Sequence, residues 1–291
     1  MKAKNTTSDK VFLAVTYITL ILLTVTILYP LLQVITISLS SAESIYKPGM
    51  HIIPTDLDFS GYKIIFKKEL IWTSYRNTIV RTVIGTAITV FLTFLGAYTL
   101  SKKTLPHRKF WTGFVTLTMF FSGGMIPSYL LVVKVLNINN TIWSLVLPGA
   151  INTFYLIVTR NFIAMLPESL EESAKIEGAN DIYILFKIIM PLSMPILTTV
   201  ALYTMVYHWN AWFDCMMYIQ NESKYVLQLV LRRIILEGAD ATAEMSGQVV
   251  NTNLESMKMA TLVVAILPII CVYPFLQKYF VQGMLVGSVK G

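Results

Sequence analysis

Six long stretches of this 291-residue chain contain no aspartate, glutamate, lysine or arginine. They cover residues 11–42, 82–101, 110–133, 135–159, 188–213 and 259–277. The shortest is 19 residues long, and an α-helix that crosses a bilayer needs ~20 apolar residues. Only 13% of the residues are charged, whereas soluble domains carry about 25%. The sequence therefore predicts an integral membrane protein and not a large soluble helical core.

The predicted fold is all-α, a polytopic membrane protein with six transmembrane helices. One membrane domain covers residues 11–281, and its spans are predicted at about 11–37, 78–100, 110–134, 141–160, 189–213 and 259–280. Residues 11–42 lack the short apolar core and the cleavage site of a removable signal peptide, so we expect this helix to be retained.

The basic residues predict which side of the membrane each loop occupies. Residues 101–109 contain four basic residues and no acidic one, and short loops rich in Lys and Arg stay in the cytoplasm. Counting crossings from there places residues 1–10, the loop 161–190 and the tail 282–291 inside. The loop 214–258 is then outside.

Several classes of function find no support in the sequence. Cys215 and Cys271 form neither a disulfide framework nor a metal site by spacing, and the net charge of +7 is spread over loops without the basic stripe that nucleic acids need. His51, His107 and His208 are scattered, so no catalytic constellation assembles. A phosphate loop ending in Gly-Lys-Ser/Thr is missing from the sequence, so we expect no enzyme activity and no cofactor bound by this chain.

The third predicted span is interrupted by Gly123, Gly124 and Pro127. Proline removes a backbone hydrogen bond and clashes with the preceding turn, and a break inside a membrane needs neighbouring protein or a cavity to satisfy the freed groups. Two interpretations stay open at this stage, a kink against a neighbouring helix and a bend that lines a passage.

The outer loop contains an amphipathic segment with two adjacent arginines, Arg232 and Arg233. Its apolar residues fall on one face of a short predicted helix: Leu227, Val230, Leu231, Ile234 and Ile235. A helix on the membrane surface and a gate or docking surface for an outside partner are both compatible with this pattern.

The loop 161–190 is predicted to be ordered, because it carries its own helix signals. Pro167 and Glu168 suit the first turn of a helix, and Gly178 suits its end. Asn180 or Asp181 can cap a second helix over residues 182–190. A cytoplasmic loop of this length with two helices is expected to do more than connect two spans.

The same loop resembles a known motif. Glu172-Ser173-Ala174, Gly178 after three residues, and Ile188-Ile189-Met190-Pro191 after nine more resemble the EAA motif of ABC-importer permeases, with Ser173 and Met190 as departures. The resemblance extends over nearly the whole chain and is closest to carbohydrate importers of the maltose-permease type. FSGGMIPSYLL, LPGAINTFYLIVTRNF and YPFLQKYFVQGMLVGSVKG resemble a branch that handles complex oligosaccharides such as alginate or pectin fragments.

The resemblance implies a type I ABC importer fold in a bacterial cell membrane, with a coupling helix that docks on an ATPase. The coupling residues would be Glu172, Ser173, Ala174, Glu177, Gly178, Ala179 and Pro191. Implied partners are a second permease subunit, two copies of a cytoplasmic ATPase that bind ATP and Mg, an extracellular or periplasmic substrate-binding protein, an oligosaccharide and membrane lipid. The tail 282–291 would reach the ATPase interface.

Polar and aromatic side chains near the outer half of the fifth span are candidates for the sugar pathway, because rings stack on sugars and amides or carboxylates bind hydroxyls. They are Tyr207, His208, Trp209, Asn210, Trp212 and Asp214, with Asn152, Tyr155 and Gln33 as weaker candidates. Trp and Tyr also form the ordinary interfacial belt. A hydrogen-bonded packing role suits His208 better than metal binding, because no second ligand lies at helical spacing.

The main alternative is an ion-coupled carrier or channel. Such proteins usually need ionisable residues at mid-membrane depth. Apart from Arg81 near a span edge and His208, the predicted spans lack them. The sequence therefore favours an ATP-driven oligosaccharide importer subunit.

Overall fold

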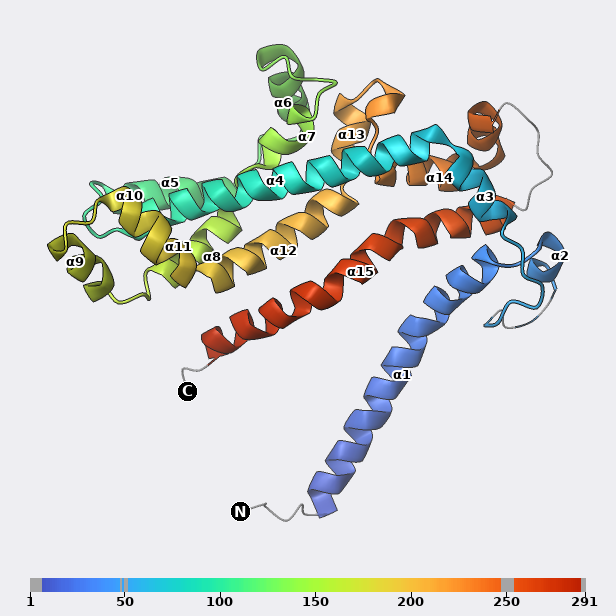
Figure 1. Ribbon diagram of the computed structural model, residues 1–291, viewed down its shortest axis with the longest axis horizontal. Coiled ribbons are helices and arrows are strands. Elements are labelled where there is room, and N and C mark those ends of the chain that lie inside the picture. Colours follow the sequence, from blue (N-terminus) through green and yellow to red (C-terminus); the bar gives the residue numbers. More distant parts are fainter. Residues whose placement is uncertain (1–6, 48, 50–51, 247–253, 289–291) are drawn as a thin grey trace. The chain divides into compact units, whose positions relative to one another are not determined.

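The computed structural model describes residues 7–47, 49, 52–246 and 254–288 (Figure 1). Within these ranges the regular elements are all helices, and the one β contact is an isolated bridge between Ser40 and Leu57. The prediction of an all-α fold is confirmed. The chain divides into two units, unit 1 with Met1–Glu69 and Leu231–Leu267, and unit 2 with Leu70–Val230 and Pro268–Gly291.

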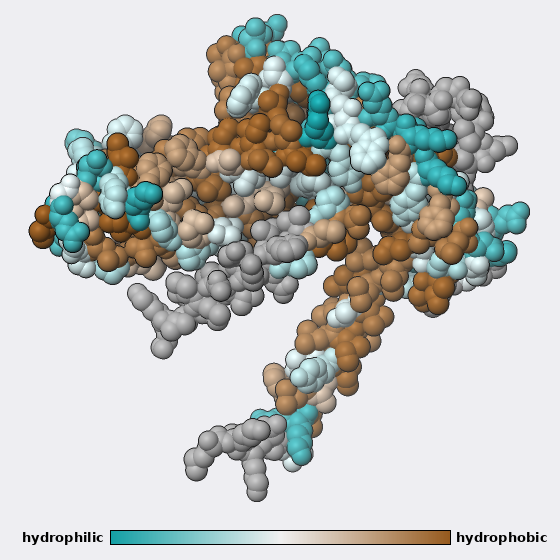
Figure 2. Space-filling view, viewed as in Figure 1, coloured by the Kyte–Doolittle hydropathy of each residue, from teal (hydrophilic) through white to brown (hydrophobic). Residues whose placement is uncertain are grey.

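Unit 1 begins with α1 (Thr7–Ser38), followed by α2 (Ala42–Ile45) and α3 (Ser60–Lys67). The apolar side chains of α1 are exposed along most of its length (Figure 2), which suits a helix surrounded by lipid. Its carboxyl end is buried and makes two polar contacts. The Ser38 hydroxyl lies 2.8 Å from the Tyr62 hydroxyl, and Ser256 Oγ donates to the Ser38 carbonyl at 3.2 Å.

The longest helix in unit 2 is α4 (Glu69–Ser101), which starts nine residues before the span predicted at 78. Its buried face carries small and hydroxyl residues, including Thr82, Gly85 and Thr86. A Cβ at Gly85 would overlap the ring of His208 on α12 (Met194–Asn210). Small residues of this kind let two membrane helices approach closely.

The third predicted span is broken, as its glycines and proline indicate. α5 (Arg108–Phe120) is followed by α6 (Met125–Leu130) and the π-helical η1 (Leu131–Val135), and the two halves are bent by 109°. Gly124, at the break, has φ +86°, a conformation that residues with a Cβ rarely adopt. This angle is far larger than a kink, so the segment is a broken span or a re-entrant loop.

The fourth predicted span, 141–160, is not one helix. It divides into α7 (Trp143–Val146), the 3-10 turn η2 (Leu147–Gly149) and α8 (Thr153–Ile163). Pro148 lies in the 3-10 turn, and the Asn152 side chain accepts a hydrogen bond from the Tyr155 N–H and begins a new helix. In the described part of the chain, three helices are long and apolar enough to span a membrane, or up to five when two bent pairs count as spans. The count of six remains a prediction.

The cytoplasmic loop predicted at 161–190 consists of short helices. They are α9 (Ser169–Ile176), α10 (Asp181–Tyr183), the π-helical η3 (Ile184–Ile189) and α11 (Met190–Leu192). α11 leads into α12 across a bend of 75°.

After α12 come α13 (Phe213–Tyr218), η4 (Glu222–Lys224), α14 (Leu227–Ser246) and α15 (Leu254–Ser288). In α14 the apolar residues Leu227, Val230 and Leu231 are buried, and Arg232 is exposed. One apolar face is therefore present, as the sequence predicted. The predicted tail 282–291 begins inside α15, and residues 289–291 lie outside the described part of the chain.

Candidate functional site

Gly178 ends α9 in the loop that resembles the EAA motif. Its φ of +85° lies in the left-handed region, and the next residue, Ala179, donates its N–H to the Ala174 carbonyl at 2.9 Å. This bond closes the helix end in the way that a glycine after a helix allows. The following helix starts at once, because the Asn180 side chain accepts the Tyr183 N–H at 2.7 Å.

One residue of α9, Ala174, is buried in a shared apolar cluster. Its partners come from α4, α8, η3 and α12: Phe94, Ala97, Ile163, Ile184, Ile189 and Leu197. Phe94 and Ala97 are fully buried. The cluster holds α9 against the ends of four other elements, so the loop is packed and not merely tethered.

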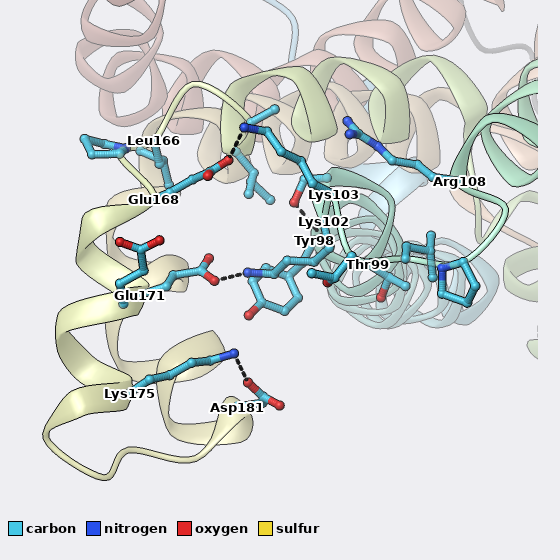
Figure 3. A pocket seen from close by; sticks show the side chains of 18 residues that line it. Tyr98, Thr99, Lys102, Lys103, Arg108, Leu166, Glu168, Glu171, Lys175 and Asp181 are labelled. Atoms are coloured by element: carbon cyan, nitrogen blue, oxygen red, sulfur yellow. Dashed lines mark hydrogen bonds and ion pairs between the residues drawn. The ribbon is translucent and has the colours of Figure 1, made fainter.

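Ion pairs surround the same helix (Figure 3). Lys102 pairs with Glu171, and Lys103 Nζ lies 2.6 Å from Glu168 Oε1. Within the loop, Lys175 Nζ lies 3.1 Å from Asp181 Oδ1. These side chains line an open cavity of about 580 Å³ between α9 and the basic loop that follows α4.

In the two outer pairs, the partner favours the charged form of Glu168 and of Lys175. A hydrogen bond from Lys103 lowers the pKa of Glu168, and a hydrogen bond to Asp181 raises the pKa of Lys175. Both pairs are well exposed to solvent, and exposed pairs contribute little to stability.

Most of the predicted coupling residues face solvent. Glu172, Ser173, Glu177, Gly178 and Pro191 are exposed, Ala179 is half-buried and Ala174 is buried.

Two exposed apolar residues on this surface, Ile176 and Ile182, were not among the predicted coupling residues. Ile176 is 88% exposed and Ile182 is 70% exposed, and Figure 2 shows apolar side chains among polar ones around α9. The sequence signal that could have indicated this surface is Ile176, an apolar residue at the otherwise polar end of α9.

A second cluster surrounds a buried arginine on α4. The Arg81 side chain is fully buried, and its Nη1 donates to Asp214 Oδ1 at 3.0 Å and to the Ala211 carbonyl at 3.2 Å. Its Nη2 donates to Asp214 and, at 3.4 Å, to the Leu145 carbonyl. Asp214 was predicted as a sugar ligand, but here its carboxylate neutralises Arg81 and joins α4 to the α12–α13 break.

The other predicted sugar residues fall into three groups. His208 and Trp209 are buried, and the His208 ring packs against Gly85, with neither ring nitrogen in a hydrogen bond among the described residues. His208 is therefore a packing residue without the hydrogen bond that was expected.

A second group, exposed or half-buried, lies along one face of α12 and at the start of α8. Tyr207 is 55% exposed and Asn210 is exposed. Tyr155, half-buried, stacks on Tyr203 with ring centroids 6.2 Å apart. The remaining candidates lie elsewhere: Asn152 is exposed and caps α8, Trp212 is half-buried, and Gln33 on α1 donates to the Tyr29 hydroxyl.

The family profile described as "Binding-protein-dependent transport system inner membrane component" matches residues 95–286, which include both clusters except Arg81 and Phe94. The chain belongs to this family. It is 42% identical over 264 residues to the polygalacturonan/rhamnogalacturonan transport system permease protein YtcP of Bacillus subtilis, covering 90% of this chain and 92% of the relative. It is also 25% identical over 268 residues to the arabinooligosaccharides transport system permease protein AraQ of Halalkalibacterium halodurans, covering 90% and 91%.

Among solved structures, the chain is similar to a subunit of a bacterial ABC transporter involved in the import of the acidic polysaccharide alginate. The TM-score is 0.88 at 32% identity, over 96% of this chain and 100% of that chain. The predicted type I ABC importer fold is confirmed, and the chain is the permease component of a binding-protein-dependent ABC importer. In such a permease, α9 and Gly178 stand at the position of the EAA motif.

Proposed function

We propose that this permease serves an importer of acidic oligosaccharides, with chains of uronic acids as the substrate class. The observation that carries the proposal is agreement between two independent similarities. At 42% identity one relative is named for polygalacturonan and rhamnogalacturonan, and at 32% identity a structural neighbour imports the acidic polysaccharide alginate. Both polymers consist wholly or partly of uronic acids.

In this proposal α9 is the part that docks on the ATPase. The coupling residues are Glu172, Ser173, Ala174, Glu177, Gly178, Ala179 and Pro191. The exposed Ile176 and Ile182 are consistent with the assignment, because a docked ATPase would remove both apolar side chains from water. Buried Ala174 supports it as well, since a docking helix must be held by its own subunit to transmit force.

The remaining partners follow from this role. A second permease completes the membrane pathway, and two ATPase subunits bind ATP and Mg, because this chain has no phosphate loop in its sequence. An external binding protein delivers the oligosaccharide. A structural neighbour at 16% identity and TM-score 0.63 was solved with an alginate pentasaccharide-bound periplasmic protein. The permease itself catalyses no reaction, and both of its termini are cytoplasmic.

The proposed sugar-facing surface uses the exposed or half-buried aromatic and amide side chains, Asn152, Tyr155, Tyr207, Asn210 and Trp212. Hydroxyl and amide groups are costly in hydrocarbon unless they find a polar partner, and a sugar supplies such partners. Buried His208 and Trp209, and Asp214 in its ion pair, are left out of this surface.

Uptake by the complete transporter tests the proposal. The two permeases and the ATPase are reconstituted in proteoliposomes loaded with ATP, and the binding protein is added outside with either trigalacturonate or neutral maltotriose. We expect ATP-dependent accumulation of trigalacturonate and little of maltotriose.

Two results would contradict the proposal. Accumulation of maltotriose alone would overturn the acidic substrate class. Accumulation that continues with an inactive ATPase but collapses with a protonophore would support the ion-coupled carrier instead.

A further inference from the structure

We propose that α4 is a second path along which the ATPase moves this permease, joined to the docking helix by the Lys102–Glu171 ion pair. The inference rests on the proposed docking role of α9. The first path runs from α9 through η3 and α11 into α12. That path contains Pro191 and Pro195 and bends by 75° before α12, so it is poorly suited to act alone as a rigid connection.

The Lys102–Glu171 pair is better shielded than its neighbour. The two side chains are 27% and 21% exposed, whereas Lys103 and Glu168 are 74% and 64% exposed. Lys102 Nζ also lies 4.0 Å from the centroid of the Tyr98 ring. This cation–π contact fixes the ammonium on the side of α4 that faces α9.

The apolar cluster connects the same two helices. Phe94 and Ala97, about two turns and one turn before Lys102, are fully buried and share one apolar cluster with Ala174 of α9. A displacement of α9 therefore pushes on closely packed side chains of α4 as well as on an ion pair. Packed interiors of this kind transmit strain because they contain few voids.

The far part of α4 is anchored too. Arg81 donates to Ala211 and Leu145 carbonyls and pairs with Asp214. The 20 residues between Arg81 and Ser101 span about 30 Å of helix, which is close to the thickness of the hydrocarbon core. α4 contains no proline over its whole length, so it reaches from the docking helix to the α12–α13 break without a sharp bend.

Charge reversal in the assembled transporter tests this second path. Lys102→Glu and Glu171→Lys are made singly and together, and complexes of correct stoichiometry are isolated before measurement. The readout is the fold stimulation of ATPase activity by the binding protein, which a defect in folding alone does not change in intact complexes. We expect each single variant to lose about five-fold or more of this stimulation, and the double variant to recover most of it.

The exposed neighbours provide a matched control, because Lys103→Glu and Glu168→Lys reverse charges on the same two segments. Their stimulation should stay close to that of the wild type. If a reversal prevents assembly, Lys102→Met and Glu171→Gln replace it, and the same loss is expected.

Single variants with wild-type stimulation, or a double variant that recovers nothing, would overturn the role of α4. Failure of the substrate proposal gives a different result, since wild-type complexes would then fail to accumulate trigalacturonate while the ATPase readout remained measurable.

Discussion

Two parts of α4 are held by ion pairs, and the two pairs differ in their surroundings. Arg81 is fully buried and reaches two backbone carbonyls besides Asp214. Lys102 remains about a quarter exposed, and Lys103 beside it is mostly exposed. The Arg81–Asp214 pair fixes α4 against its neighbours, whereas the Lys102–Glu171 and Lys103–Glu168 pairs connect α4 and the docking loop at a surface that water reaches.

The difference has energetic consequences. Removal of one partner from a buried pair leaves an uncompensated charge and costs about 3–5 kcal/mol. Pairs at a solvated surface contribute about 0–1 kcal/mol, and salt weakens them further. The buried pair therefore anchors α4 among its neighbours, whereas the partly shielded Lys102–Glu171 pair, together with the apolar cluster, connects α4 to the docking loop.

The largest effect is expected for Asp214→Ala, because it leaves the Arg81 guanidinium buried without its carboxylate. We expect a loss of about 3–5 kcal/mol in stability, visible as early thermal inactivation of the purified complex. Arg76→Met, on an exposed part of the same helix, serves as the control. Combining Asp214→Ala with Arg81→Met should recover stability. An equal loss of stability in Arg76→Met would contradict the distinction between the buried pair and an exposed arginine.

Phe94→Ala removes the largest side chain of the apolar cluster and should cost about 3 kcal/mol. Thermal melting of the detergent-solubilised complex measures the loss. Val83 on α4 is 62% exposed, so Val83→Ala should change little. A tolerated Phe94→Ala would show that α9 is not held by this cluster.

Gly178→Val tests the backbone at the end of α9. A left-handed conformation costs a residue with a Cβ about 1–2 kcal/mol, and nothing lies within 4 Å of the position of that Cβ. Gly178→Asn should therefore retain more ATP-driven uptake than Gly178→Val, since asparagine tolerates this conformation. Equal loss of uptake in both variants would indicate that the docked ATPase occupies the position that any side chain at residue 178 would fill.

The smallest effect is expected for Glu168→Gln. Lys103 lowers the pKa of Glu168 in the folded state, so the stabilisation is present above the unfolded pKa and is lost as the pH falls through the folded pKa. Melting temperatures of the wild type and the variant should differ slightly at pH 7 and converge in acid. A difference in melting temperature that grows as the pH falls would contradict this prediction.

The sequence predicts those parts of the fold that depend on local chemistry. Charge-free residues 11–42 predict α1, and Gly124 and Gly178 mark a break and a helix end because their conformations disfavour other residues. The fourth span was predicted as one helix from its lack of charge. Pro148 in a 3-10 turn and the Asn152 cap divide it instead.

Contacts between distant residues were not predictable in the same way. Arg81 and Asp214 are 133 residues apart, and neither periodicity nor composition indicates that they pair. The choice of sugar candidates had the same weakness. Tyr207 and His208 are adjacent, but helix rotation exposes one and buries the other against Gly85. Only the packing of α4 against α12 separates them.

Photocrosslinking from α9 tests the docking role most directly. In a background with Cys215→Ser and Cys271→Ser, a benzophenone maleimide is attached to Ile176→Cys, or to Val135→Cys, which is 72% exposed at the end of η1. The predicted result is a covalent product of this permease with the ATPase from Ile176→Cys and none from Val135→Cys. ATPase products from Val135→Cys alone, or none from Ile176→Cys in an active complex, would contradict it.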